Sequence, residues 1–228
     1  MQKTHRSESV VVVGLLGLCL LLGSPDSSLA ASPSAALPLD GAEADKLIVR
    51  LALYDNAGLD PQIMSATQGE VAAIFSQIGV AVEWVDTEDL ASGTGPAETS
   101  YLKVMLSDEP YRAWKLPEAA MGHAPGSEFP RLAVFVFDSR VRQALEGGKR
   151  RMLALDPGNL GRALGRAMAH EVVHALTPEP FHARSGLMRA GQDSQTLTCP
   201  EVKLDDKSVA ELQRGLTALR ELSLGASS

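Results

Sequence analysis

The segment that most constrains how this chain can fold contains two histidines four residues apart, His170 and His174. In an α-helix, this spacing places two side chains on one face, one turn apart. Both imidazole rings can then point a nitrogen at the same metal ion, while Glu171 lies beside them. The segment therefore predicts a metal-binding helix.

This helix is predicted to begin near Asn159, a suitable N-cap residue, and to end at Thr177. Pro178 sets the end because a proline pushes the residue before it out of helical geometry. Small residues recur along the helix and would let it pack closely against a sheet or another helix. They are Gly161, Ala163, Gly165, Ala167 and Ala169.

A third histidine, His182, follows eight residues after His174. Three of the four histidines beyond residue 30 thus lie between positions 170 and 182, which scattered core histidines would rarely do. A catalytic zinc site needs three protein ligands and one open position. We therefore expect His170, His174 and His182 to bind one Zn²⁺ and Glu171 to act as the base toward a water molecule at the open position.

The N-terminal thirty residues have the pattern of a secretory signal. Lys3 and Arg6 precede an uncharged apolar run at 10–22, and Ala30 ends a segment of small residues that a signal peptidase could cleave. The apolar run is too short to span a bilayer comfortably. The sequence predicts a secreted or periplasmic protein without a membrane span.

Composition indicates one globular domain after this signal. The chain has 228 residues, of which 45% are hydrophobic and 21% are charged. Residues 31–45 are rich in Ala, Pro and Ser and predict a flexible leader, so the folded domain is expected at 46–228. The net charge of -7 argues against nucleic acid or an anionic membrane as the partner. Only Cys199 remains after cleavage, which excludes an intramolecular disulfide.

Hydrophobic patterns elsewhere predict an α+β domain. The expected strands are 47–54, 80–85, 101–106 and 132–137, and the expected helices are 60–78 and a short one at 142–145. A C-terminal helix is predicted from a capping-box spacing at Ser208 and Glu211, with Leu212, Leu216 and Leu219 on its apolar face.

Residues 170–188 resemble the zinc-binding segment and Met-turn of the metzincin clan of zincin metallopeptidases. The matching residues are His170, His174 and His182 for the ligands, Glu171 for the general base and Met188 for the methionine beneath the site. The resemblance implies a zincin-like domain with a small mixed β-sheet, a backing helix at 60–78, an active-site helix and a C-terminal helix. It also implies an edge strand near Ala119 to Ala124 that would pair with an extended peptide or protein substrate.

The match departs from a standard metzincin family. Such a family has a glycine three residues after the second histidine and the third histidine three residues further on, whereas this chain has Thr177 and a gap of eight. Residues 31–45 contain no cysteine for a cysteine switch, and no tyrosine follows Met188 to stabilise the oxyanion. The oxyanion-stabilising residue therefore has no assignment from the sequence.

Other residues offer alternatives for the site. As in the gluzincin branch, Glu211 on the C-terminal helix could be the third ligand, with Glu179 and Glu201 as further candidates. His123 could line the cleft or be a solvated loop residue. Cys199 could be a fourth ligand, a reactive thiol or a small buried hydrophobe.

The sequence thus predicts a secreted zinc metalloendopeptidase that cleaves peptide bonds with zinc-activated water. The alternative is a zincin-fold zinc-binding protein without turnover that acts as a binding module. Glu171 favours the enzyme because a purely structural site has no use for a base. Peptide deformylases share the five-residue pattern, but their cysteine ligand lies upstream, where the mature chain has none.

Overall fold

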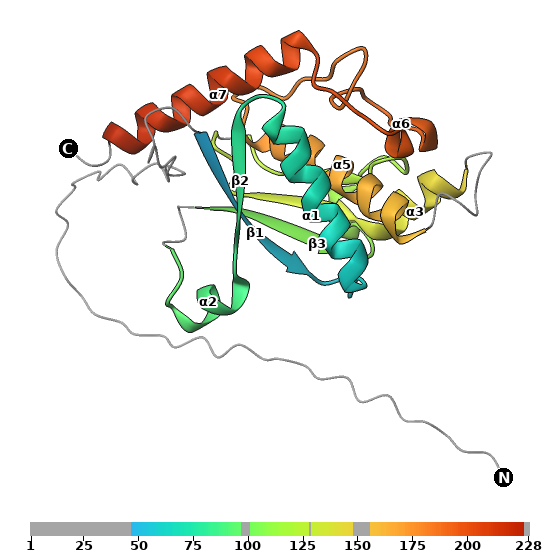
Figure 1. Cartoon of the computed structure of the whole chain (residues 1–228). Helices are drawn as coiled ribbons and strands as arrows, with labels where there is room; N and C mark the ends of the chain where they lie inside the picture. Colours follow the sequence, from blue (N-terminus) through green and yellow to red (C-terminus); the bar gives the residue numbers. More distant parts are fainter. Residues whose placement is uncertain (1–46, 97–100, 128, 148–155, 226–228) are drawn as a thin grey trace. The chain divides into compact units, whose positions relative to one another are not determined.

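The computed structural model describes residues 47–96, 101–127, 129–147 and 156–225 (Figure 1). The predicted signal at 1–30 and the predicted leader at 31–45 lie outside these residues. Within the described ranges, no helix is both long and apolar enough to cross a membrane.

A five-stranded mixed sheet forms the centre of the domain, with the strand order β2-β1-β3-β5-β4. The strands are β1 (Leu47–Asp55), β2 (Val80–Val85), β3 (Leu102–Ser107), β4 (Gly122–His123) and β5 (Ala133–Phe137). All neighbouring pairs are parallel except β4 and β5, which are antiparallel. The four strands predicted from the hydrophobic pattern are confirmed to within one residue at each end. Strand β4 is an edge strand and lies inside the segment predicted to be one.

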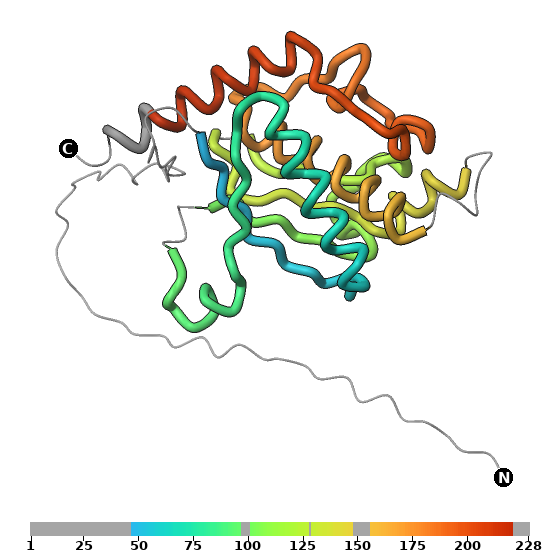
Figure 2. The backbone as a smooth tube through the Cα atoms, in the orientation of Figure 1, coloured from blue at the N-terminus to red at the C-terminus, as the bar shows by residue number. Residues whose placement is uncertain are grey.

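One face of the sheet carries the hydrophobic core. In β3, Leu102, Val104 and Leu106 are fully buried, while the residues between them are half-buried, as the alternation of side chains in a strand requires. Helices α1 (Pro61–Ser76) and α5 (Pro157–Ala175) pack on this face and against each other (Figure 1). Figure 2 follows the chain from β1 in blue to the C-terminal helix in red.

The backing helix α1 forms where it was predicted but ends at Ser76, two residues before the predicted end at 78. Asp60 is its N-cap, where Oδ1 accepts a hydrogen bond from the Gln62 amide at 2.8 Å, and Pro61 occupies the first turn. Glycines in α5 allow the two helices to approach closely. A side chain at Gly161 would overlap Ala66, and a Cβ at Gly165 would lie 2.7 Å from the Glu70 Cβ. The small residues of α5 thus serve the close packing that the sequence suggested.

The bounds predicted for α5 are wrong at both ends. The N-cap is Asp156, not Asn159: Asp156 Oδ1 accepts from the Gly158 amide at 3.0 Å, and Pro157 follows as the first helical residue. The helix ends at Ala175, two residues before Thr177. The Thr177 hydroxyl donates to the Val173 carbonyl at 3.0 Å and so satisfies one of the last acceptors of the helix.

The C-terminal helix α7 (Asp206–Gly225) is present, but the predicted capping box is not. Asp205 caps this helix by accepting a hydrogen bond from the Ser208 amide at 2.8 Å. Ser208 and Glu211 are therefore the third and sixth residues of the helix and do not cap it. Leu212, Leu216 and Leu219 are buried, as the helical period predicted.

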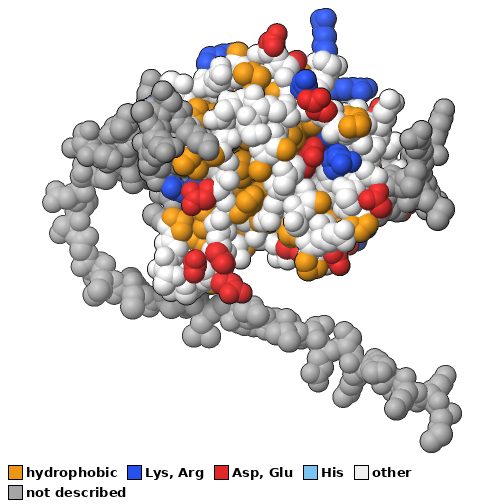
Figure 3. Space-filling view, viewed as in Figure 1, with side chains coloured by type: hydrophobic (Ala, Val, Ile, Leu, Met, Phe, Trp, Pro, Cys, Tyr) orange, Lys and Arg blue, Asp and Glu red, His pale blue; other side chains and the backbone are white. Residues whose placement is uncertain are grey.

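The remaining elements are short. Helix α3 (Asp138–Glu146) is longer than the predicted 142–145 because it begins directly after β5. Three elements were not predicted, namely α2 (Thr87–Ser92), the 3-10 helix η2 (Arg112–Trp114) and α6 (Ser194–Thr198). Figure 3 shows acidic and basic side chains scattered over the face in view, in keeping with the moderate net charge of -7.

Candidate metal centre

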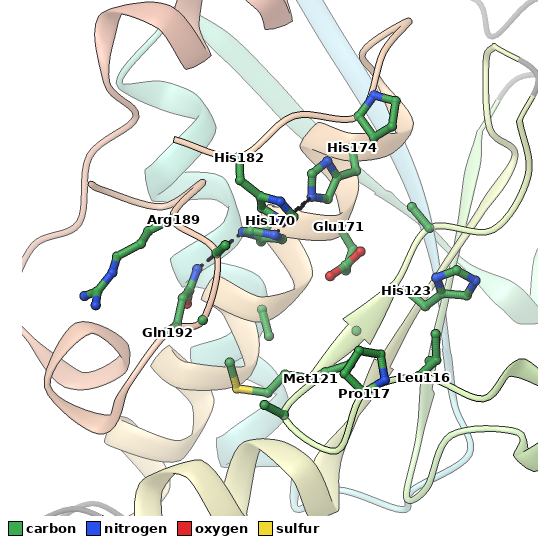
Figure 4. A pocket seen from close by; sticks show the side chains of 18 of the residues that line it. Leu116, Pro117, Met121, His123, His170, Glu171, His174, His182, Arg189 and Gln192 are labelled. Carbon is green, nitrogen blue, oxygen red and sulfur yellow. Dashed lines mark hydrogen bonds between the residues drawn. The ribbon is translucent and has the colours of Figure 1, made fainter. Parts of the chain in front are cut away.

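Three histidine side chains converge where α5 ends (Figure 4). His170 and His174 project from one face of α5, and the chain after Pro178 and Pro180 returns to place His182 beside them. The Nε2 atom of His174 lies 3.1 Å from that of His170 and 3.3 Å from that of His182. The spacing of His170 and His174 and the clustering of the three histidines predicted this convergence, with Glu211 as the alternative third ligand.

The distances between the ring nitrogens fit a bound metal ion. Nitrogen ligands lie about 2.0 to 2.1 Å from Zn²⁺, so two of them in a tetrahedral site are separated by about 3.3 Å. The distances of 3.1 and 3.3 Å between the histidine nitrogens agree with this value. Three protein ligands leave one tetrahedral position for water or substrate.

Hydrogen bonding orients His170 for metal binding. Its Nδ1 lies 2.9 Å from the carbonyl oxygen of Leu187, which can only accept, so the proton resides on Nδ1 and the lone pair on Nε2 faces the other rings. The side-chain amide of Gln192 donates to the same carbonyl. Gln192 is buried, and no local pattern around it signals this role. For His174, no described residue pairs with the buried Nδ1 atom.

The two helix histidines are held in the neutral form that a metal ligand requires. Burial lowers the pKa of His170 to about 4. Burial lowers the pKa of His174 to about 3, and electrostatic repulsion of its protonated form by His170, His182 and Arg131 acts in the same direction. Both rings therefore carry no charge near neutral pH.

Glu171 lies beside the triad and points into the same cavity (Figure 4). It is 9% exposed, and burial raises the pKa of its carboxyl to about 8. Its side chain fills the space where residue 122 would have a side chain: a Cβ at Gly122 would lie 2.8 Å from both Cδ and Oε1 of Glu171. Strand β4 can approach Glu171 this closely only because residue 122 is glycine.

The triad and Glu171 line a cavity of about 510 Å³. Its walls are α5, strand β4 with the segment before it, and the loop around Arg189 to Gln192. Met121 directs its backbone toward β5, since its carbonyl accepts from the Phe137 amide at 2.9 Å. Backbone groups alternate in direction along an antiparallel strand, so the N–H and C=O of Gly122 face the free edge. The cavity therefore opens beside backbone groups of β4 for which the described part of the chain offers no partner.

His123 borders this cavity, but its ring does not face the metal triad. The side chains of adjacent strand residues point to opposite faces, and Gly122 faces Glu171. The His123 ring instead packs against Trp114, with 5.1 Å between ring centroids. Figure 4 shows the ring directed away from the three other histidines. Of the two alternatives for His123, the structure supports the one in which it lines the cleft, since it belongs to β4 and borders the cavity.

Arg131 anchors the end of α5, a role for which the sequence carried no signal. Its Nη1 donates to the carbonyl oxygens of His174 at 2.7 Å and Thr177 at 3.0 Å, and its Nε donates to that of Gly126 at 3.1 Å. These carbonyls lack helical partners, and the positive guanidinium suits the negative end of the helix dipole. Arg131 thus fixes the backbone of a candidate ligand to the rim of the cavity.

The loop after His182 makes a tight turn with Met188 in the core. The Ala183 amide donates to the Met188 carbonyl at 2.7 Å, and Gly186 has a φ of 73°, which favours glycine. A side chain at Gly186 would also overlap the carbonyl of Lys203. Met188 is fully buried. The residue before it, Leu187, provides the carbonyl oxygen that accepts the hydrogen bond from His170.

The carboxylates considered as alternative third ligands do not join the histidine pair. Among the described residues, the potential ligand atoms that gather within 4.8 Å of one another come from the three histidines. Glu211 pairs instead with Arg214, and neither Glu179 nor Glu201 lines the cavity. Cys199 accepts a hydrogen bond from the buried Arg166 through Sγ at 3.1 Å, so it serves the packing of α6 on α5.

Comparison with known proteins leaves the family open. No family model matches the sequence, and no curated protein matches it. Among solved structures, the chain is similar to the archaemetzincin from Methanopyrus kandleri, with 15% identity, a TM-score of 0.49, and coverage of 74% of this chain and 96% of that one. The roles of the residues must therefore be argued from the geometry of the site.

Proposed function

We propose that this protein is a zinc-dependent peptidase in which His170, His174 and His182 hold the metal ion and Glu171 is the general base. The observation that carries the proposal is the convergence of three Nε2 atoms, 3.1 and 3.3 Å apart, beside a buried carboxyl in an open cavity. A site that only stabilised the fold would have no need of the cavity or of the carboxyl.

A bound Zn²⁺ would supply Lewis acidity, polarising a peptide carbonyl and lowering the pKa of a nearby water. Glu171 would receive the proton of that water and pass it to the departing amine. Its carboxyl must be ionised to do so, and burial opposes this by raising its pKa to about 8. The positive charge of a metal ion held by the histidine triad would lower the pKa of the adjacent Glu171 carboxyl. Metal binding and activation of the base would therefore be coupled.

The free edge of β4 supports a peptide as the substrate. Gly122 turns its N–H and C=O toward the free edge next to Glu171, where no described residue pairs with them, and an extended chain can bind such an edge as an additional strand. Main-chain hydrogen bonds would hold the peptide whatever its sequence, which suits an endopeptidase. The N-terminal signal pattern supports action outside the cytoplasm, after cleavage near Ala30.

Two measurements test this function. Purified protein should contain about one zinc per chain and should hydrolyse an unstructured protein such as reduced, alkylated casein. Glu171→Ala should keep its zinc and lose hydrolysis by about a hundredfold or more. Glu179→Ala is a matched control, because Glu179 is exposed and lies on the loop between two of the histidines. A zinc-loaded wild type without hydrolysis would favour the non-catalytic binding module.

A further inference from the structure

We propose that His123 and Trp114 form a binding subsite for an aromatic or large apolar side chain of the peptide, on the face of β4 opposite the metal. The inference deepens the proposed function, since it takes a peptide at the edge of β4 as the ligand. It assigns a role to the face of β4 that lies opposite the histidine triad. The supporting observations are the alternation of side chains in β4 and the aromatic contacts of Trp114.

The two residues of β4 face opposite sides of the sheet. Gly122 faces Glu171 and α5, whereas His123 lies on the other face and pairs across the strands with Phe135 of β5. Any strand added beyond β4 must show the same alternation. A peptide residue opposite Gly122 would direct its side chain into the metal cavity, and the residue opposite His123 would direct its side chain onto the face that carries Trp114.

Aromatic rings already form a continuous row on that face. The Trp114 ring lies over two strands at once, with its centroid 4.6 Å from Phe135 and 5.1 Å from His123. Directly opposed residues of neighbouring strands have Cβ atoms about 4.5 to 5.5 Å apart. Phe135 and His123 are neighbours across two strands, and the peptide side chain opposite His123 would be the next neighbour in this aromatic row. It would also touch the edge of Trp114.

The backbone geometry favours this contact. Gly122 turns its hydrogen-bonding groups toward the free edge, so the neighbouring position His123 would form a non-hydrogen-bonded pair with the peptide. Side chains are closer in such pairs. Tyr111 widens the surface: its ring meets Trp114 edge-on at 6.0 Å, and it remains 68% exposed.

The chemistry of the row selects apolar and aromatic side chains over charged ones. Burial lowers the pKa of His123 below its usual 6.5, so the ring is neutral near pH 7. Edge-to-face contacts between such rings add attraction beyond the burial of apolar area. Beyond Trp114, the surface continues into a second cavity of about 410 Å³ that Tyr111, Phe135 and Met105 help to line.

The test uses binding without cleavage. Blocked six-residue alanine-rich peptides, each with a single Phe, Leu, Asn or Lys moved through every position, are titrated into zinc-loaded Glu171→Ala protein. The chain has two tryptophans, Trp84 and Trp114. In the Trp84→Phe background the tryptophan fluorescence comes from Trp114 and therefore reports on this face. At one position, Phe should bind about three- to tenfold more tightly than Asn and should change the Trp114 emission.

The preference should disappear in Trp114→Ala, return in part in Trp114→Phe, and survive in Tyr54→Ala, a matched change on β1, three strands from β4. A Phe preference that persists in Trp114→Ala, or peptide binding that leaves Trp114 emission unchanged, would overturn the subsite. So would a failure of every peptide to bind. Hydrolysis of casein by the wild type is measured separately. If hydrolysis is intact but the Phe preference does not depend on Trp114, the subsite is refuted and the proposed function is retained. If the preference depends on Trp114 but no hydrolysis occurs, the proposed function is refuted and the subsite is retained.

Discussion

The carboxyl of Glu171 occupies the position that a side chain at Gly122 would take, with 2.8 Å between a Cβ at residue 122 and both Cδ and Oε1 of Glu171. Gly122 has no unusual backbone conformation that calls for glycine. Its lack of a side chain is needed only for space. The same residue presents its N–H and C=O to the free edge of β4, so the proposed base and the proposed peptide-binding edge meet at one position.

Gly122→Ala should therefore displace Glu171 without touching the histidines. We expect kcat for peptide hydrolysis to fall about ten- to a hundredfold while zinc content stays near one per chain. Gly69→Ala is the matched control, because a Cβ there meets no atom within 4 Å. Steady-state kinetics and elemental analysis check both results.

A double-mutant cycle separates this effect from general disruption. If Gly122 acts only through Glu171, then Gly122→Ala should cost little further activity in a Glu171→Ala background. Additive losses in the double variant would mean that the alanine disturbs the site by another route, such as the strand edge itself.

The third metal ligand can be identified by comparing two variants. His182→Ala removes one of three converging nitrogens and should weaken zinc binding by at least about a hundredfold, because two histidines alone hold the ion poorly. Glu211→Ala should leave zinc affinity unchanged, since Glu211 pairs with Arg214 on the surface of α7. Competition with a chromophoric chelator measures both. The reverse pattern would assign the site to Glu211.

Zinc binding should release a proton from Glu171. The carboxyl has a pKa of about 8 without metal, so it is protonated at about pH 6.5, whereas His170 and His174 are already neutral because their pKa values are about 4 and about 3. The positive charge of the metal favours the ionised carboxylate. Wild type should release about one proton more than Glu171→Gln. Calorimetry in two buffers of different ionisation enthalpy counts the protons, and equal counts would contradict the coupling.

The metal-free protein should lose stability as the pH rises. Burial raises the pKa of Glu171 from its usual 4.5 to about 8 in the folded state, so folding favours the protonated form. The resulting contribution is fully present below the unfolded pKa and is lost as the pH rises through the folded pKa. Between about pH 5 and pH 8, the unfolding free energy of wild type should fall by a few kcal/mol relative to Glu171→Gln. Urea unfolding with a chelator present tests this, and parallel curves would refute it.

The sequence revealed those parts of the fold that depend on local pattern. Three such patterns lie within short segments, and the structure contains each of them. They are the alternation in the strands, the helix start at Asp60 and Pro61, and the spacing of His170, His174 and His182. The start of α5 was misjudged although its signal, Asp156 followed by Pro157, was present. An aspartate N-cap followed by a proline is a local signal, so this helix start is also encoded within a short segment.

Contacts between distant segments could not be predicted from local patterns in the sequence. Nothing local marks Gly122 as the residue that makes room for Glu171, because that role exists only once β4 is placed beside α5. The same holds for Arg131, whose acceptor on His174 lies 43 positions away. The peptide edge was implied by resemblance, but the aromatic row on its other face depends on how η2 folds over β4 and β5.

Arg131 gives the last prediction, because it ties the carbonyl of a candidate ligand residue to the cavity rim. Arg131→Met would remove the arginine donors from the carbonyls of His174, Thr177 and Gly126. Each buried acceptor that loses its partner costs about 1 to 3 kcal/mol, so we expect the metal-free protein to lose at least about 2 kcal/mol of unfolding free energy. Zinc affinity should fall about tenfold because the end of α5 frays beneath His174.

Arg142→Met is the control for loss of an arginine charge, since Arg142 is 38% exposed and pairs with Asp138 on the same helix. Such a pair contributes about 1 kcal/mol or less. Arg131→Lys should restore part of the stability, because one ammonium can replace some of the three donors but not their planar arrangement. Urea unfolding and zinc competition on the four proteins separate these effects. If Arg131→Met bound zinc as tightly as Arg142→Met, the clamp on His174 would have no bearing on the metal centre.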